Sequence, residues 1–412
     1  MAQIYRRKTC RLCEGTDLEL VFHLEPTPPA DHYISREQLD KPQEVYPLDL
    51  FFCKTCTNLQ LLDVIDPEVL FGNYIYTTSS SPGLINHFQK YSEEIIRQLQ
   101  PSLNSLCIDI GSNDGTLLRF LKEKGFRVLG VDPAREVAQR ATKSGIETLP
   151  HFFSSELGKK MKKDFGTARI ITANNVFAHS DTLGDMAKGI RGLLSPDGIF
   201  IFEISYVVDL VQNMVFDFIY HEHLCYHSLE SLKIFFNLHD LELIDAQRVS
   251  TKGGSLRCFV QVKNGPLKPS KTLKNLLKIE KEEGYNSSEK YKVYAKKING
   301  LRGNLEKLLK KLKTEKKKIG GYGASATVTT LIYHFHLGDS LAFIVDDEIS
   351  RQNLYSPGFH IPILSPDKLY SEKPDYVLIL AWRFADQIIS KHQKFRDEGG
   401  QFIVPLPELT VI

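Results

Sequence analysis

The sequence lacks the features of a membrane or secreted protein. No apolar run among its 412 residues approaches the 18 or more residues that a membrane-spanning helix requires. The opening stretch MAQIYRRKTC contains two Arg and a Lys, but no apolar segment follows them as it would in a secretory signal. We therefore expect a cytoplasmic protein that has no membrane partner.

The sequence also lacks an excess of charge of either sign. With 52 basic and 50 acidic residues its net charge is +2, which creates no global attraction for nucleic acid. The Lys-rich helical stretch at 265–318 has interspersed acidic residues and few aromatic ones, so we interpret it as a solvated helix face. Hydrophobic residues make up 42% and charged residues 25%, as in soluble globular proteins, and the length allows about two to three domains.

Cysteines are few but regularly spaced. Four of the seven form two C-x-x-C pairs near the N-terminus. Each pair can direct two thiolates at one ion, and four thiolates suit tetrahedral Zn²⁺ with no position left for a substrate. The alternatives are a redox C-x-x-C or unrelated thiols. We predict a structural zinc site with the ligands Cys10, Cys13, Cys53 and Cys56.

An amphipathic helix at 84–100 is followed by strands alternating with helices, which is typical of a parallel sheet covered on both faces. The predicted strands are Leu106–Ile110, Arg127–Val131, Arg169–Ala173 and Ile199–Ile204. The predicted helices are at about 115–124, 133–144, 182–194 and 228–238. Two further strands, 241–249 and 255–263, are joined by a loop that predicts a hairpin.

A second α/β pattern begins at Lys318. Its predicted strands are 318–322, 341–345, 375–381 and 401–405, and its predicted helices are at about 325–335 and 384–397. The fold class is therefore α/β with two separate sheets. Because each half can close its own sheet, we expect a monomer.

The first strand of the central region runs into a glycine loop, D-x-G-x-x-x-G, that lacks a phosphate-binding device. It is neither G-x-G-x-x-G nor a P-loop. Gly111 lets the chain turn sharply off the strand, and Gly115 lets the following helix pack closely. Asp132 ends the next strand, where an acidic residue can accept both hydroxyls of a ribose. This combination suggests S-adenosylmethionine, with Asp109 or Asp114 facing its cationic end.

Polar residues also follow the predicted strand at 169–173. Ligands of open α/β sheets bind at the carboxyl ends of the strands, so Asn174, Asn175 and His179 should line the same crevice. Together with the terminal hairpin, these features predict a seven-stranded methyltransferase sheet. The predicted cofactor-binding residues are Asp109, Gly111, Asn113, Asp114, Gly115, Asp132, Asn174 and Asn175.

Three histidines, a glutamate and two tyrosines fall within the eight residues 220–227. His221 and His223 could chelate a metal ion on a strand, although the helical H-E-x-x-H spacing is absent. The cluster could also be a polar aromatic patch of purely structural role. We favour acid–base chemistry, because one histidine can take a proton while a tyrosine or second histidine supports developing oxyanion charge.

The ordered set of motifs resembles the sugar C-methyltransferases of deoxysugar biosynthesis, which act on nucleotide-linked 4-keto-6-deoxysugars. The resemblance covers nearly the whole chain, and the Tyr-His-Glu-His-Leu run is its most specific part. The motifs are the two Cys-x-x-Cys pairs, Asp109–Gly115, Tyr220-His221-Glu222-His223-Leu224, Gly253-Gly254-Ser255-Leu256-Arg257, Gly321-Tyr322-Gly323-Ala324 and Leu380-Ala381-Trp382.

The resemblance implies three parts. These are a small zinc-binding module (1–70), a seven-stranded class I, Rossmann-like methyltransferase domain (71–265), and a Rossmann-like α/β domain (266–412) that helps to hold the nucleotide sugar. The cofactors it implies are S-adenosylmethionine and zinc. Its partner is a nucleotide-linked keto-deoxysugar. Arg383 stands where the family more often has Asn, so the sugar, its nucleotide and the methylated carbon stay open.

The resemblance also implies roles for single residues. It places the catalytic base on His223 and the active-site tyrosine on Tyr220, with His179 and Glu222 at further active-site positions. A tyrosine-rich segment at 74–80 matches one that reaches over the active site in the family. The predicted substrate-binding residues are Tyr74, Tyr76, Gly321, Tyr322 and Gly323.

A mechanism follows as a hypothesis. A ketone at C4 of the sugar makes the hydrogen on C3 (or C5) acidic, and His223 would remove it to give an enolate. Tyr220, with His179 or Glu222, would support the charge on oxygen. The enolate carbon would then attack the sulfonium methyl in line.

Two alternatives remain. Gly321-Tyr322-Gly323-Ala324-Ser325-Ala326 is a G-x-G-x-x-A loop after a strand, and Asp346 and Asp347 lie about where a ribose acid would be. The first alternative is therefore a nicotinamide-dependent oxidoreductase of nucleotide sugars. The second is a non-catalytic binding protein with a methyltransferase core.

Overall fold

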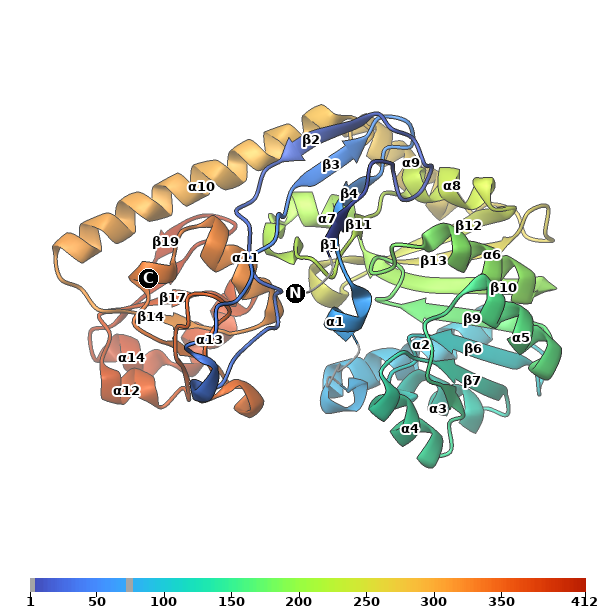
Figure 1. Ribbon diagram of the computed structural model, residues 1–412, viewed down its shortest axis with the longest axis horizontal. Coiled ribbons are helices and arrows are strands. Elements are labelled where there is room, and N and C mark those ends of the chain that lie inside the picture. Colours follow the sequence, from blue (N-terminus) through green and yellow to red (C-terminus); the bar gives the residue numbers. More distant parts are fainter. Residues whose placement is uncertain (1–3, 72–76) are drawn as a thin grey trace.

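The computed structural model describes residues 4–71 and 77–412, which form two lobes joined along one side (Figure 1). One lobe contains a seven-stranded sheet and the other a six-stranded sheet, and the N-terminal strands and helix α10 (Ser288–Thr314) run between them. Tyr74 and Tyr76 lie outside the described residues. Across the described ranges, no helix is both long and apolar enough to cross a membrane.

The seven-stranded sheet confirms the predicted fold, with the strand order β12-β13-β10-β9-β6-β7-β8. Strand β13 runs antiparallel to both of its neighbours, so the predicted hairpin closes one edge of a parallel sheet. The strands are β6 (Leu106–Ile110), β7 (Arg127–Val131), β8 (Thr148–Leu149), β9 (Ala168–Asn174), β10 (Leu194–Ser205), β12 (Leu241–Val249) and β13 (Ser255–Val262).

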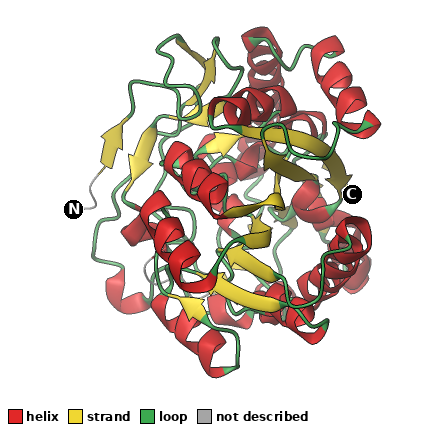
Figure 2. Ribbon diagram, turned by 90° about the vertical axis from the view of Figure 1, so that its right-hand side faces the viewer, coloured by secondary structure: helices red, strands yellow, loops and turns green. Residues whose placement is uncertain are grey.

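Helices lie on both sides of the strands in this lobe (Figures 1 and 2). All five residues of β6 are buried, which explains why a central strand has an almost continuous apolar sequence. The helices are α2 (Pro82–Leu99), α3 (Thr116–Glu123), α4 (Arg135–Lys143), α5 (Ser155–Phe165), α6 (Leu183–Leu193), α7 (Val207–Gln212), α8 (Leu229–Leu238) and α9 (Lys271–Glu282).

The N-terminal residues form a four-stranded antiparallel sheet in the order β11-β4-β3-β2. Its strands are β2 (Leu18–Phe22), β3 (Leu50–Cys53), β4 (Leu59–Leu61) and β11 (Cys225–Tyr226), and beside it lie the pair β1 (Ile4–Arg6) and β5 (Asp63–Ile65) and the helix α1 (Pro67–Phe71). The strand β11 belongs to the histidine-rich segment. The N-terminal sheet is therefore completed by residues within the range predicted for the methyltransferase domain.

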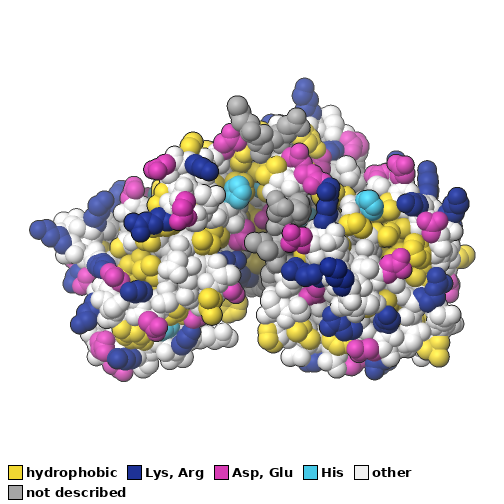
Figure 3. All heavy atoms as spheres, turned by 60° about the horizontal axis from the view of Figure 1, so that its bottom comes forward, with side chains coloured by type: hydrophobic (Ala, Val, Ile, Leu, Met, Phe, Trp, Pro, Cys, Tyr) yellow, Lys and Arg dark blue, Asp and Glu magenta, His cyan; other side chains and the backbone are white. Residues whose placement is uncertain are grey.

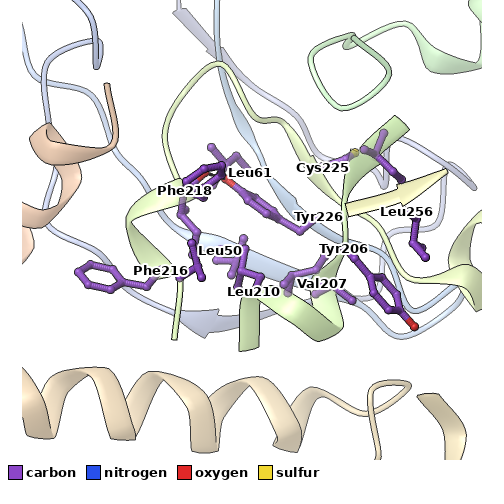
Figure 4. Close-up of a cluster of buried hydrophobic side chains, with 14 of the residues drawn as sticks. Leu50, Leu61, Tyr206, Val207, Leu210, Phe216, Phe218, Cys225, Tyr226 and Leu256 are labelled. Carbon is purple, nitrogen blue, oxygen red and sulfur yellow. Dashed lines mark hydrogen bonds between the residues drawn. The ribbon is translucent and has the colours of Figure 1, made fainter. Parts of the chain in front are cut away.

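Apolar side chains of the N-terminal sheet and of the methyltransferase lobe share one core. Figure 4 shows Leu50 and Leu61 of the N-terminal sheet beside Leu210, Phe218 and Tyr226. All five side chains are less than 10% exposed. Burial of this apolar surface holds the N-terminal sheet to the segment that contains the catalytic candidates.

The second lobe has the strand order β16-β15-β14-β17-β18-β19, which is the order of a Rossmann-like sheet. All neighbours pair in parallel except β19. The strands are β14 (Ile319–Tyr322), β15 (Ile344–Val345), β16 (Ile363–Leu364), β17 (Tyr376–Ile379), β18 (Gln401–Val404) and β19 (Thr410–Val411). The helices are α11 (Ala326–His334), α12 (Lys368–Glu372), α13 (Ala385–Lys391) and α14 (Gln393–Asp397).

Helix α10 accounts for most of the Lys-rich stretch. One face is buried, and its Tyr294 ring packs 6.1 Å from the ring of Phe22 in β2, while Lys296 and Lys297 on another face are exposed. This agrees with a solvated helix face. The surface in Figure 3 likewise has basic and acidic side chains interspersed over both lobes, which are separated by a notch.

Candidate active site

A cavity of about 510 Å³ lies at the carboxyl ends of strands β6, β7 and β9. This is where open α/β sheets bind their ligands. Six of the eight predicted cofactor-binding residues line it: Asp109, Gly111, Asn113, Asp132, Asn174 and Asn175.

The glycine loop wraps one end of this cavity. Gly111 has φ +71°, and a Cβ atom there would lie 2.2 Å from Cγ2 of Val176, so the position requires glycine. The backbone N–H of Asn113 donates to Oδ2 of Asp132 at 2.8 Å, and the N–H of Ala134 donates to Oδ1 at 2.9 Å. Asp132 thus fixes the loop, and each oxygen keeps a lone pair for a ligand hydroxyl.

Asp109 gives the cavity an unusual electrostatic character. The residue is 4% exposed, and its carboxyl accepts a hydrogen bond from Oγ1 of Thr172 at 2.6 Å. Burial raises the pKa of Asp109 to about 7, and burial also raises the pKa of Asp132. A cationic ligand in the cavity would favour the ionised form of both carboxyls.

Asp114 and Gly115 are not among the residues that line either described cavity. Asp114 accepts hydrogen bonds from the N–H of Ser79 at 2.8 Å and from Oγ1 of Thr116 at 2.6 Å. Gly115, with φ +76°, is the N-cap of α3 and lies against the side chain of Ile146. Both residues shape the loop and its contact with the segment before α2, and their prediction as cofactor ligands stays without support from the cavity.

A second cavity of about 350 Å³ adjoins the first. The two share Asn175, His179, Tyr220 and His223 in their linings. The far wall of the second cavity includes Arg383 and Phe384, which come from the other lobe. Three of the four predicted catalytic residues therefore line both cavities, and the fourth, Glu222, lines the first one alone.

A backbone contact orients the ring of His223, the residue predicted to be the base. Its Nδ1 lies 2.8 Å from the carbonyl oxygen of Phe218, in the short helix Phe216–Phe218. A carbonyl oxygen only accepts, so Nδ1 carries the proton and Nε2 is left as the basic nitrogen. The ring of His223 lies 4.2 Å from that of Tyr220 and 4.9 Å from that of His179, measured between ring centroids.

The other histidines of the cluster have different surroundings. Nε2 of His221 lies 3.3 Å from the carbonyl oxygens of both Tyr46 and Pro47, and burial lowers the pKa of His221 to about 4. Burial likewise lowers the pKa of His227 to about 3. In the chain as described, the group that could hold a metal ion is the cysteine cluster, so a metal site at His221 and His223 has no support.

The four predicted zinc ligands come together. Their sulfur atoms all lie within 4.8 Å of one another, with 3.5 Å between Cys10 and Cys56 and 3.6 Å between Cys13 and Cys53. A tetrahedral site with Zn–S bonds of 2.3 Å has S···S edges of about 3.8 Å. The cysteines therefore fit a closed zinc site, and they leave no position for a substrate.

The second glycine loop has a different setting. Gly323, with φ +105°, packs against Ala381, and the hydroxyl of Tyr322 donates to Asp347 at 2.9 Å. The hydroxyl of Tyr33 donates to the carbonyl oxygen of Ala324 at 2.6 Å, so the N-terminal region covers the loop. Neither described cavity includes the predicted substrate residues Gly321, Tyr322 and Gly323 in its lining.

Several lining residues were not predicted from the sequence, and three of them are Tyr5, Asp181 and Arg383. Tyr5 and Asp181 line the first cavity, and Arg383 lines the second. Asp181 follows His179 by two residues, which is the signal that could have indicated it. The guanidinium carbon of Arg383 lies 4.4 Å from the centroid of the Phe218 ring. Its departure from the family pattern was visible, but its place in the cavity depends on the packing of the two lobes.

Comparison with known proteins decides the family. The chain is 33% identical over 404 residues to the C-methyltransferase NovU of Streptomyces niveus, an alignment that covers 98% of this chain and 96% of NovU. The chain belongs to the C-methyltransferase family. Family models match successive parts of this C-methyltransferase: a zinc binding domain at 10–71, a methyltransferase domain at 85–246 and a C-methyltransferase C-terminal domain at 250–407.

Solved structures also resemble part of the enzyme. Magnesium protoporphyrin IX methyltransferase of Synechocystis PCC 6803 with bound S-adenosylhomocysteine is 14% identical, with a TM-score of 0.34, over 44% of this chain and 85% of that one. The PH0226 protein of Pyrococcus horikoshii OT3 is 15% identical, with a TM-score of 0.38, over 48% of this chain and 98% of that one. The relative NovU and the three family models, rather than these structures, show that the enzyme is an S-adenosylmethionine-dependent C-methyltransferase with a zinc-binding N-terminal domain.

Proposed function

We propose that the enzyme transfers a methyl group from S-adenosylmethionine to C3 of a nucleotide-linked 4-keto-6-deoxysugar, through an enolate formed by His223. The observation that carries this proposal is the presence of His223 in the linings of both cavities. A base at that junction can reach a substrate in the smaller cavity while the methyl donor occupies the larger one. We take the enzyme to act as a cytoplasmic monomer.

The first chemical step is the removal of a proton from carbon. Nε2 of His223 accepts the proton from C3, and the electron pair of the broken C–H bond forms the enolate with the C4 carbonyl. The adjacent hydroxyl of Tyr220 supports the charge that develops on the oxygen. His179, whose ring meets that of His223 edge to face, helps to orient the base.

The second step forms the new carbon–carbon bond. S-adenosylmethionine supplies an electrophilic methyl group on a sulfonium ion. The electron pair of the enolate forms the bond from C3 to the methyl carbon and the S–CH₃ bond breaks, which restores the C4 ketone. The proton stays on His223 until solvent removes it. The buried carboxyl of Asp109 supplies negative charge that favours a sulfonium ligand, and Asp132 accepts the hydroxyls of its ribose.

The substrate cavity has a positive group that suits a nucleotide diphosphate. Arg383 stacks on Phe218, and Nε1 of the neighbouring Trp382 donates to Oδ2 of Asp217 at 3.0 Å, which fixes the two lobes to each other at this wall. A guanidinium binds phosphate oxygens with fork geometry. We therefore assign Arg383 to the diphosphate of the substrate.

The proposal is tested by incubating the zinc-containing protein with S-adenosylmethionine and a panel of nucleotide-linked 4-keto-6-deoxysugars in heavy water. Mass spectrometry should show a product heavier by one methylene unit, and carbon NMR should place the new methyl group on C3. Deuterium without the methyl group would support the base and exclude that sugar as the natural substrate. A panel with neither change would overturn the proposed substrate class.

A further inference from the structure

The N-terminal zinc knuckle contains a buried arginine that contacts the segments of both active-site histidines. Arg11 stands between the ligands Cys10 and Cys13, and its side chain has no exposed surface. Its Nε donates to Oδ1 of Asp181 at 2.7 Å. Its Nη1 donates to the carbonyl oxygen of Leu224 at 3.1 Å. Asp181 follows His179 by two residues, and Leu224 directly follows His223.

Further contacts fix the same segment. The carbonyl oxygen of Leu224 also accepts from the N–H of Leu61 at 3.0 Å, and the N–H of Leu224 donates to the carbonyl oxygen of Ala178 at 2.9 Å. Leu224 therefore joins the zinc-binding domain to the residue that precedes His179. The backbone directly after His223 is thereby held from the N-terminal sheet and from the segment that follows β9.

A second connection runs through Asn58. Its Nδ2 lies 3.6 Å from Sγ of Cys225 and 4.0 Å from Sγ of the zinc ligand Cys10. Cys225 begins β11, the strand that pairs with β4 and completes the N-terminal sheet. Both connections thus start at the first cysteine pair and end within two residues of His223.

Burial of an arginine is costly unless its charge and hydrogen bonds are satisfied, and a packed apolar residue would often stabilise a fold as well. What an arginine adds is several directed donors held in one plane. Here those donors reach the carboxylate of Asp181, two residues after His179, and the carbonyl of Leu224, directly after His223, which would set the distance between the two histidine segments.

We infer that Arg11 is a positioning residue, through which the zinc knuckle fixes His223 and His179 for proton abstraction. This inference rests on the proposed function, because it takes His223 as the base. A displacement of about 1 Å at a reacting group can cost about 100-fold in rate, so loss of these contacts should act on the proton-transfer step.

The test compares the full-length, zinc-loaded Arg11→Gln, Arg11→Lys and Arg6→Gln variants. Arg6 lies in the same domain and pairs with Asp63 at 3.1 Å, with its side chain 48% exposed, so Arg6→Gln is a matched control. Zinc content and the Kd for S-adenosylmethionine are measured first. We expect both to stay near wild type in all three variants.

The deciding readout is the rate of deuterium exchange into the 4-keto sugar and its pH profile. Arg11→Gln should lower the exchange rate about tenfold or more and shift the profile, Arg11→Lys should restore part of the rate, and Arg6→Gln should match wild type. Wild-type exchange in Arg11→Gln would overturn the inference. Joint loss of zinc, cofactor binding and exchange in both Arg11 variants would also overturn it, by reducing Arg11 to a folding role.

A readout that needs no sugar separates this inference from the proposed function. Diethyl pyrocarbonate modifies neutral histidines, and peptide mass spectrometry gives the modification rate of His223 alone. If wild type exchanges no deuterium, the proposed function fails, yet an altered rate or pH midpoint at His223 in Arg11→Gln would still show the positioning role. If the modification rate of His223 and its pH midpoint were the same in Arg11→Gln as in wild type, the positioning role would be contradicted.

Discussion

Nδ1 of His223 lies 2.8 Å from the carbonyl oxygen of Phe218, five residues earlier in the chain. The ring of Phe218 in turn lies under the guanidinium of Arg383 from the other lobe. One aromatic residue therefore orients the candidate base with its backbone and forms the floor for a cation with its side chain. This arrangement joins the candidate base to the wall of the second cavity.

Replacement of the base should separate chemistry from binding. In His223→Asn, methyl transfer and deuterium exchange should fall by about 10²–10⁴-fold, because no group remains to take the proton. The Kd for S-adenosylmethionine, measured by calorimetry, should stay near wild type. His239→Asn is the matched control, since His239 ends α8 and lines neither described cavity. Wild-type rates in His223→Asn would refute the assignment of the base.

Cofactor affinity should depend on pH through Asp109. With a pKa of about 7 in the free protein, this carboxyl is mostly protonated at pH 6 and mostly ionised at pH 8. A cationic ligand binds the ionised form, so the apparent Kd for S-adenosylmethionine should rise about tenfold on going from pH 8 to pH 6.

The control for that titration is Asp109→Asn. It should bind the cofactor more weakly than wild type at pH 8 and show little change in Kd between pH 6 and pH 8. A wild-type Kd that is constant over this range would mean that Asp109 does not contact the cation. If the Kd of Asp109→Asn depended on pH as strongly as that of the wild type, the titrating group would be another residue.

Arg383 should act on substrate affinity rather than on the base. Arg383→Ala should raise the KM for the nucleotide sugar by about 10- to 100-fold, because a charge-assisted hydrogen bond is worth about 1.5–3 kcal/mol, while the Kd for S-adenosylmethionine stays constant. The KM of Arg383→Lys should lie between the KM values of the wild type and Arg383→Ala. Arg351→Ala is a suitable control, because Arg351 pairs with Asp31 at 3.3 Å and lines neither described cavity. A fall in kcat at constant KM would contradict this role and would indicate that Arg383 stabilises the reacting oxygen instead.

Much of the fold could be predicted because the patterns that indicate its strands and turns lie within short segments of the sequence. The strands β6 and β7 are apolar runs bounded by turn residues, and the structure has them at the predicted bounds. The glycine loop was recognisable because positive φ at Gly111 allows few other residues. By contrast, β8 has only two residues, too few for a periodic pattern, so the sequence did not show it.

The unpredicted parts depend on contacts between distant segments. The pairing of β11 with β4 joins residues about 165 positions apart, and the contact of Arg11 with Asp181 joins residues 170 positions apart. Periodicity and spacing carry no signal for such contacts. The second glycine loop keeps its predicted substrate role as a prediction, and its contact with Tyr33 of the N-terminal region was likewise not visible in the motif.

Loss of zinc should disable the active site through the N-terminal sheet. Binding of a structural zinc ion is worth about 10–16 kcal/mol in small zinc domains, so chelation or Cys53→Ser should unfold the sheet that β3 and β4 form. The apolar core of Leu61 and Tyr226 would open, and β11 beside His223 would lose its partner strand. Methyl transfer should therefore be lost although the cysteines touch neither described cavity.

Limited proteolysis within residues 10–61, paired with cofactor titration, tests this prediction. We expect new cleavage sites there, while S-adenosylmethionine still binds. Full activity of the metal-free protein would show that the sheet holds the histidine segment without zinc.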